Sequence, residues 1–277
     1  MQFRASGVAP LFLGTDGLTS TQEATLENLL ARYKSWQIEE DPKLKKKYEL
    51  TQNMLNEMST LTEAISKFNR GEIELPTGAK TYVEEIVDKE LYAYRTSISN
   101  KEMDKGSDED IENEAIETYN RVFVTDHKKL MTGDKYAELN HNHLVGHPDI
   151  VCEITKMVKD AKSSWSKKTF PKRVKDAENS TYSWQVRSYL YMLQMMTGDD
   201  SWRSGEVFHC LVDTPLGLVP EWEDDSLHNM ANVPDNMRLT VVPVELTNDN
   251  IKHMERRISA GIKYADVYRN ELLNKNK

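Results

Sequence analysis

Two neighbouring runs rich in β-branched residues, at 143–154 and 156–165, constrain the fold of this chain more than any other feature. Each run has the length and composition of a strand, and the short gap between them predicts a hairpin. Two further runs of this kind follow at 206–213 and 237–246, with helical spacing between the pairs. The order of helices followed by β-β-α-β-β-α predicts an α/β protein with a central mixed β-sheet flanked by helices.

The first hundred residues predict an α-helical front section, because they contain few helix breakers. A capping-box spacing from Ser20 to Glu23 opens a stretch of apolar residues at helical intervals that runs to about Trp36. We expect a second helix after Pro42 and a third after residues 76–78.

Three more helices are expected in the rest of the chain, at 108–123, 182–196 and 248–273. No internal repeat, low-complexity tract or clear linker separates them from the front section. We therefore expect an N-terminal helical region, residues 1–104, and a core, residues 105–277, that form one continuous globular unit.

The composition excludes several classes of protein. With 36 Lys and Arg against 45 Asp and Glu, the net charge of −9 argues against a protein that coats nucleic acid non-specifically. Cys152 and Cys210 are too few for a disulfide scaffold or a four-thiolate zinc site. The most apolar early stretch, 8–13, is far shorter than a membrane span or a signal-peptide core, so we expect a cytoplasmic protein without membrane insertion.

One local cluster opposes the acidic balance. The segment 162–175 contains six Lys or Arg and no acidic residue, and Trp165 and Phe170 lie among them. This pattern is typical of a strip that follows a phosphate backbone, and a solvated loop is the alternative. The residues predicted to bind DNA are Trp165, Lys167, Lys168, Lys172 and Arg173.

The predicted hairpin carries two carboxylates and a lysine. Asp149 ends the sequence Gly-His-Pro-Asp, and Asp160 follows eleven residues later. The period of a strand places Asp160 and Lys162 on one face and Ala161 on the other. If the strands pair, Asp149 lies near Asp160, and two close carboxylates suit a hard divalent cation such as Mg²⁺ or Mn²⁺.

The flanking helices contribute three further polar candidates. Glu112 lies on the apolar face of the helix predicted at 108–123, where a carboxylate is costly to bury without a cation. Gln185 and Tyr189 are four residues apart and project from one face of the next helix as neighbouring polar tips.

In type and in order, these residues resemble the PD-(D/E)XK nuclease superfamily, and within it the RecB-like and phage recombination exonuclease branch. The family pattern is a helical Glu, an Asp in a G-x-P-D strand, (D/E)-x-K on the next strand, and a helix with Q-x-x-x-Y. The matching residues here are Glu112, Asp149, Asp160 with Lys162, and Gln185 with Tyr189. The resemblance covers residues 105–193 and, more loosely, the C-terminal strands and helix.

The resemblance implies a restriction-endonuclease-like core and a metal-dependent deoxyribonuclease, an exonuclease in DNA recombination or repair. It implies ligands for one or two Mg²⁺ or Mn²⁺ ions, a lysine that positions the attacking water, and two residues that hold the substrate strand or the lysine. The resemblance assigns the ligands to Asp149, Asp160, the carbonyl of Ala161 and Glu112. It assigns the positioning of the water to Lys162, and the holding of the strand or the lysine to Gln185 and Tyr189. The implied partners are DNA, a single-strand-annealing or single-strand-binding protein, and further copies of the chain. The implied location is the cytoplasm of the host cell of a phage.

Several alternatives stay open. Four residues compete with Glu112 for the first carboxylate: Glu84, Glu85, Asp110 and Glu114. The same fold suits a catalytically inert DNA-binding protein or a site-specific endonuclease. The histidines of 141–147 lack a zinc-site spacing, and no G-x-x-x-x-G-K-[ST] sequence for an ATP-driven helicase occurs in the chain.

Overall fold

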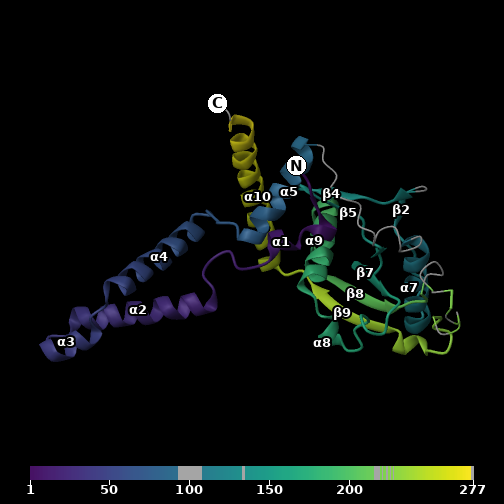
Figure 1. Ribbon diagram of the computed structural model, residues 1–277, viewed down its shortest axis with the longest axis horizontal. Helices are drawn as coiled ribbons and strands as arrows, with labels where there is room; N and C mark the ends of the chain where they lie inside the picture. The colour runs from purple at the N-terminus through teal and green to yellow at the C-terminus, as the bar shows by residue number, and fades with distance from the viewer. Residues whose placement is uncertain are drawn as a thin grey trace.

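The computed structural model describes residues 1–92, 108–132, 135–214 and 228–275, with 219, 221, 222, 224 and 226. At 108–110, 131–132 and 135–136 only the backbone is described. Figure 1 shows a body of strands and helices from which an arm of three helices projects.

The helices are η1 (Ala5–Gly7), α1 (Ala9–Phe12), α2 (Ser20–Ile38), α3 (Pro42–Tyr48), α4 (Gln52–Asn69), α5 (Thr77–Tyr92), α7 (Asp108–Phe123), α8 (Val174–Ala177), α9 (Ser180–Thr197), η4 (Asp235–Met237) and α10 (Asn248–Asn274). The strands are β1 (Phe3–Arg4), β2 (Met131–Thr132), β3 (Lys135–Tyr136), β4 (Leu139–His141), β5 (Leu144–Gly146), β6 (Ile150–Cys152), β7 (Met157–Ser164), β8 (Ser204–Leu211) and β9 (Leu239–Glu245).

The central sheet has the strand order β6-β7-β8-β9 and is mixed, because β7 and β8 are parallel and the outer pairs are antiparallel. Its two faces belong to two apolar clusters. Val158 and Val207 pack on one side with residues of α9, whereas Ala161 and Phe208 pack on the other with residues of α7. The predicted mixed sheet flanked by helices is therefore confirmed.

The extreme N-terminus joins this body. Phe3 pairs with Leu144 where β1 runs parallel to β5, and Phe3, Leu11 and Phe12 are buried in the same cluster as α9 and α10. No sequence pattern predicts β1, because two residues carry no periodic signal. Core residues thus lie on both sides of the predicted division at 104, which itself falls outside the described residues.

Two details of the predicted helices are wrong. The capping box of α2 lies one residue earlier than expected, where Thr19 and Gln22 satisfy each other's backbone N–H groups. The stretch after Pro42 forms two helices, α3 and α4, because the Thr51 hydroxyl accepts a hydrogen bond from the Met54 amide and starts a new helix.

The hairpin is shorter than predicted. Of the run 143–154, only β6 pairs with β7, and the first part of that run, β5, belongs to a separate three-stranded sheet with β1 and β4. Pro148 lies between β5 and β6, and a proline cannot donate a hydrogen bond to a strand ladder.

The projecting arm consists of α2, α3 and α4 (Figure 1). Leu26, Leu29 and Leu61 are buried in it, and Arg32 closes its tip by donating hydrogen bonds to three backbone carbonyls at 47–49. None of the helices in the described part of the chain is long and apolar enough to cross a membrane.

Candidate active site

A cavity of about 300 Å³ lies where β7, α7, α9 and the N-terminal strand meet. Its lining includes every side chain for which the sequence predicted a catalytic role, which are Glu112, Asp149, Asp160, Lys162, Gln185 and Tyr189. Residues from four separate elements of the chain therefore face one space.

Strand β7 places Asp160 and Lys162 side by side, as the strand period predicted. Asp160 is only 1% exposed, and the Lys162 ammonium lies 2.6 Å from its Oδ2 atom. Burial opposes the charge of Lys162, but the attraction of Asp160 outweighs it and raises the pKa of the lysine. Lys162 is therefore a stable cation that can orient a water or a phosphate, and it is not a general base at neutral pH.

Helix α9 reaches the same carboxylate from above the sheet. The Gln185 side-chain amide donates a hydrogen bond of 2.9 Å to Asp160 Oδ1, and it lies 3.0 Å from the Tyr189 hydroxyl. Gln185 thus contacts the carboxylate and not the lysine, and it fixes the orientation of Asp160.

Asp149 stands just before β6 and is pulled toward β7. Its Oδ2 atom accepts a hydrogen bond of 2.6 Å from the backbone N–H of Ala161. Burial, and then repulsion by Asp160 and Glu112, raises the pKa of Asp149 to about 8. The carboxylates thus crowd one another, and a cation between them would relieve this repulsion.

Among the rival carboxylates whose side chains the structure describes, Glu112 alone lines the cavity. It forms an ion pair with Lys129. Of the rivals on α5, Glu84 accepts a hydrogen bond from the Tyr264 hydroxyl, and Glu85 is exposed. The side chain of Asp110 lies outside the described residues.

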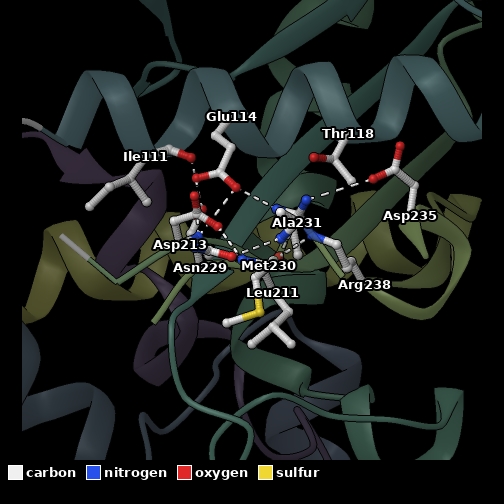
Figure 2. A network of polar contacts seen from close by, with 12 residues as sticks. Ile111, Glu114, Thr118, Leu211, Asp213, Asn229, Met230, Ala231, Asp235 and Arg238 are labelled. Atoms are coloured by element: carbon white, nitrogen blue, oxygen red, sulfur yellow. Dashed lines mark hydrogen bonds and ion pairs between the residues drawn. The ribbon is translucent and has the colours of Figure 1, made fainter. Parts of the chain in front are cut away.

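Glu114 belongs to a polar network with Asp213 and Arg238, as Figure 2 shows. It forms an ion pair with Arg238 and accepts hydrogen bonds from the backbone N–H of Asp213. Arg238 in turn donates to the carbonyl of Leu211 at the end of β8. Glu114 therefore anchors α7 to the end of the sheet, which leaves Glu112 as the better placed carboxylate.

The donor set fits a hydrated Mg²⁺ or Mn²⁺ ion. Asp160 Oδ2 is buried and accepts no hydrogen bond of ordinary geometry, although it is ion-paired with Lys162. Within the described chain, no three His, Cys, Asp or Glu side chains converge closely enough to ligate one ion. Asp149 and Asp160 would thus need water as further ligands, which is the usual habit of Mg²⁺.

Sequence reasoning missed Arg4 and Ser6, which also line the cavity. The exposed Arg4 adds a cation to a space rich in carboxylates, where it can bind an anionic substrate group. No motif marks these residues, because only the pairing of β1 with β5 brings them to the site.

A second network lies beneath the sheet, on the opposite face of β7 from Asp160. The buried Lys159 ammonium lies 2.6 Å from Glu206 Oε2 and 2.9 Å from the Tyr119 hydroxyl, which donates to the same carboxylate. These three residues connect β7, β8 and α7, the elements around the site. The alternation of polar residues along β7 could have revealed Lys159.

Part of the predicted DNA-binding strip makes contacts within the protein itself. Lys167, Lys168 and Lys172 are exposed, and Arg173 forms an ion pair of 2.6 Å with Asp176. Phe170 is buried against Leu211 and Met230, so it anchors the strip and cannot stack on a base. Trp165 lines a neighbouring cavity.

No family model and no curated protein matches this chain. Among solved structures, a phage related exonuclease from Haemophilus somnus 129PT has 23% identity and a TM-score of 0.60, over 75% of this chain and 88% of that one. The alkaline exonuclease LHK-Exo from Laribacter hongkongensis has 13% identity over 73% and 87% of the chains, with a TM-score of 0.49. The chain therefore has the fold of the phage related exonuclease.

Proposed function

We propose that this protein is a deoxyribonuclease that hydrolyses DNA phosphodiester bonds with Mg²⁺ or Mn²⁺. The observation that carries the proposal is the single cavity lined by Glu112, Asp149 and Asp160, with Lys162 paired to Asp160. Carboxylates beside a charged lysine suit the hydrolysis of a phosphodiester, since they can hold a cation while the lysine faces the phosphate.

In this proposal Asp149, Asp160 and the carbonyl of Ala161 would hold the cation, and Glu112 would bind it through water. When bound, the cation would lower the pKa of a coordinated water and would neutralise charge on the scissile phosphate. Lys162 orients the attacking water, because Asp160 keeps its ammonium charged. Gln185 and Tyr189 hold Asp160 in place, and Arg4 pairs with a phosphate of the strand.

We further propose that the enzyme is an exonuclease in DNA recombination or repair. Its fold is that of a protein described as a phage related exonuclease, which favours cutting from an end over site-specific internal cutting. A single-strand-annealing or single-strand-binding partner, self-association and a place in the host cytoplasm complete the proposal and follow from the resemblance alone.

Digestion of end-labelled linear DNA and closed circular DNA tests the proposal. We expect EDTA-sensitive release of nucleotides from linear DNA with Mg²⁺ or Mn²⁺, and no cutting of closed circles. Discrete fragments from circles would indicate the site-specific endonuclease. Chelator-independent binding of DNA without cleavage would indicate the inert DNA-binding protein.

Two substitutions test the site itself. Asp160→Asn and Lys162→Ala should each abolish turnover, and Asp160→Asn should also abolish Mn²⁺ binding measured by calorimetry. The exposed Lys89 on α5 provides the control, because Lys89→Ala removes a lysine that is not part of the cavity lining. Normal turnover in the Lys162 variant would place the active site elsewhere.

A further inference from the structure

Helix α3 lies at the far end of the projecting arm and carries a dense group of positive charges (Figure 1). Four of its seven residues are lysines, at positions 43, 45, 46 and 47. Lys43, Lys46 and Lys47 are exposed, and spacings of three and four residues place them on one face of the helix. We call these three residues the lysine stripe. No carboxylate in the described part of the chain forms an ion pair with any of them.

The acidic residues near the stripe are placed differently. Glu39, Glu40 and Asp41 precede α3, and Glu49 follows it. The Asp41 side chain accepts a hydrogen bond of 2.8 Å from the Lys43 backbone N–H, and Glu39 accepts one of 3.1 Å from the Asp41 backbone N–H. These two carboxylates therefore cap backbone amides at the start of the helix and do not neutralise the stripe.

A structural role within the arm does not explain the lysines. The helix dipole favours cations in a last turn, which is a common reason for lysines there. Arg32 already meets this end of α3, because it donates hydrogen bonds of 2.9 to 3.3 Å to the three backbone carbonyls at 47–49. Lys43 and Lys47 are four residues apart, where like charges destabilise a helix. A negatively charged partner would relieve this repulsion.

The end of the arm supports the stripe on packed aromatic side chains. Trp36 on α2 stacks on Tyr33, with ring centres 5.9 Å apart, and the Lys45 ammonium lies 5.2 Å from the centre of the Trp36 ring. These contacts and those of Arg32 fasten α3 to α2. Lys45 thus helps to dock the helix, while the stripe stays exposed to a partner.

We propose that the lysine stripe binds the phosphate backbone of DNA outside the candidate active site. The proposal rests on the proposed function for the identity of the polyanion, and it adds a second contact surface on the arm. Duplex DNA carries one charge per about 1.7 Å of its axis, so three neighbouring ammonium groups can each meet a phosphate. Contacts to phosphates carry no sequence information, so this binding should be independent of base sequence.

The length of the arm sets a minimum length for DNA that uses both surfaces. Helix α2 has 19 residues, which makes it about 28 Å long. The cavity of the candidate active site includes no residue of the arm in its lining. Because duplex DNA rises about 3.4 Å per base pair, a duplex needs more than about eight base pairs to span the distance from the body to the stripe.

Equilibrium binding of DNA to the full chain in EDTA tests the stripe without cleavage. The test variant combines Lys43→Gln, Lys46→Gln and Lys47→Gln. Each phosphate contact adds about 0.9 to the slope of log affinity against log salt concentration. On a duplex of about 40 base pairs, the wild type should therefore lose about 40-fold more affinity than this variant between about 50 and 200 mM salt. Equal salt slopes would overturn the proposal.

Two control variants separate the charge of the stripe from its shape and from the net charge of the protein. Arginine at the same three positions keeps the charge and should preserve the wild-type slope. The combination of Lys89→Gln, Lys252→Gln and Lys275→Gln removes three exposed lysines outside the arm and should also preserve it. A slope that falls equally in the glutamine and arginine variants, or equally in the control outside the arm, would overturn the proposal.

A short DNA provides a control within each protein. A hairpin of about six base pairs cannot span the two surfaces, so the wild type and the glutamine variant of the stripe should bind it nearly alike. If the stripe instead met a second copy of this chain, the glutamine variant would self-associate less in sedimentation and keep the wild-type salt slope. That result would overturn the proposal.

The failure of this proposal is distinguishable from the failure of the proposed function. Cleavage of DNA by a wild type whose binding does not depend on the stripe would overturn the stripe alone. Binding that depends on the stripe, in a protein that cleaves no DNA with Mg²⁺ or Mn²⁺, would overturn the proposed function alone.

Discussion

Gln185 donates a hydrogen bond of 2.9 Å from helix α9 to Asp160 on strand β7. Because Asp160 is almost fully buried, this bond and the ion pair with Lys162 determine where its two oxygens point. A side chain that need not touch the substrate thus positions a carboxylate of the proposed cation site.

We expect Gln185→Leu to lower Mn²⁺ affinity and kcat by roughly 10–100-fold, the usual effect of losing a partner that orients a metal ligand. Calorimetry with Mn²⁺ and single-turnover cleavage measure the two effects. Gln194→Leu is the control, because Gln194 is equally buried on α9 but donates to the carbonyl of Asp200. Similar losses in both variants would reduce Gln185 to a packing role.

The raised pKa of Asp149 predicts how metal binding depends on pH. Its folded-state pKa of about 8 lies above its ordinary 3.8, so the ionised carboxylate is disfavoured by folding. The contribution of Asp149 to the free energy of unfolding is fully present below about pH 4 and is lost as the pH rises toward about 8. A cation favours the ionised form of Asp149. Mg²⁺ should therefore raise the melting temperature more at about pH 8.5 than at about pH 6, two values that lie on either side of the shifted pKa.

Asp149→Asn is the control for this experiment, since an amide does not titrate. Its stability should vary less between these pH values, and Mg²⁺ should stabilise it little. A Mg²⁺-induced shift of the wild type that is the same at both pH values would contradict the interpretation.

Gly146 on β5 lies in close contact with Tyr189 on α9 and with Ala5 on η1, which leaves no room for a side chain. A Cβ atom at this position would lie 2.6 Å from the Tyr189 ring and 2.8 Å from Ala5 Cβ, which is too close for either. We expect Gly146→Ala to cost about 1–3 kcal/mol of stability, the range for overpacking, and to slow cleavage through displaced Tyr189. Urea unfolding provides the measurement.

Gly78 on α5 offers the matched substitution, because a Cβ there meets nothing within 4 Å. Gly78→Ala should stabilise the helix by about 0.5–1 kcal/mol and leave activity unchanged. If Gly146→Ala were equally harmless, the close approach of β5 to Tyr189 would have no energetic role.

The ion pair between Arg238 and Glu114 should affect the candidate site, because it holds in place the helix α7 that carries Glu112. Arg238→Met would leave Glu114 half-buried without its cation, at a cost of about 2–3 kcal/mol, since the pair retains some solvent. Cleavage should fall too, because α7 also carries Glu112. Arg121→Met is the control: its pair with Asp235 is exposed, so the change should cost less than about 1 kcal/mol. Equal unfolding free energies in the two variants would argue against the anchor.

Local patterns in the sequence were sufficient for the four strands of the central sheet, for the long helices of the body and for most of the residues that line the cavity. The two runs rich in β-branched residues predicted the hairpin, the strand period placed Asp160 and Lys162 on one face, and α7 and α9 follow from helical periodicity. These features depend on interactions between residues close in the chain, so a single sequence contains them.

Tertiary packing decided which of the candidates meet. Glu112 and Glu114 are two residues apart on one helix and point to different sides, so only the docking of α7 separates a cavity residue from an anchor. The pairing of β1 with β5 places Arg4 beside Val145, although 140 residues separate them in the sequence. The register of β7 with β8 likewise places His209 beside Lys162. Such contacts join segments that have no shared period, and only the folded chain brings them together.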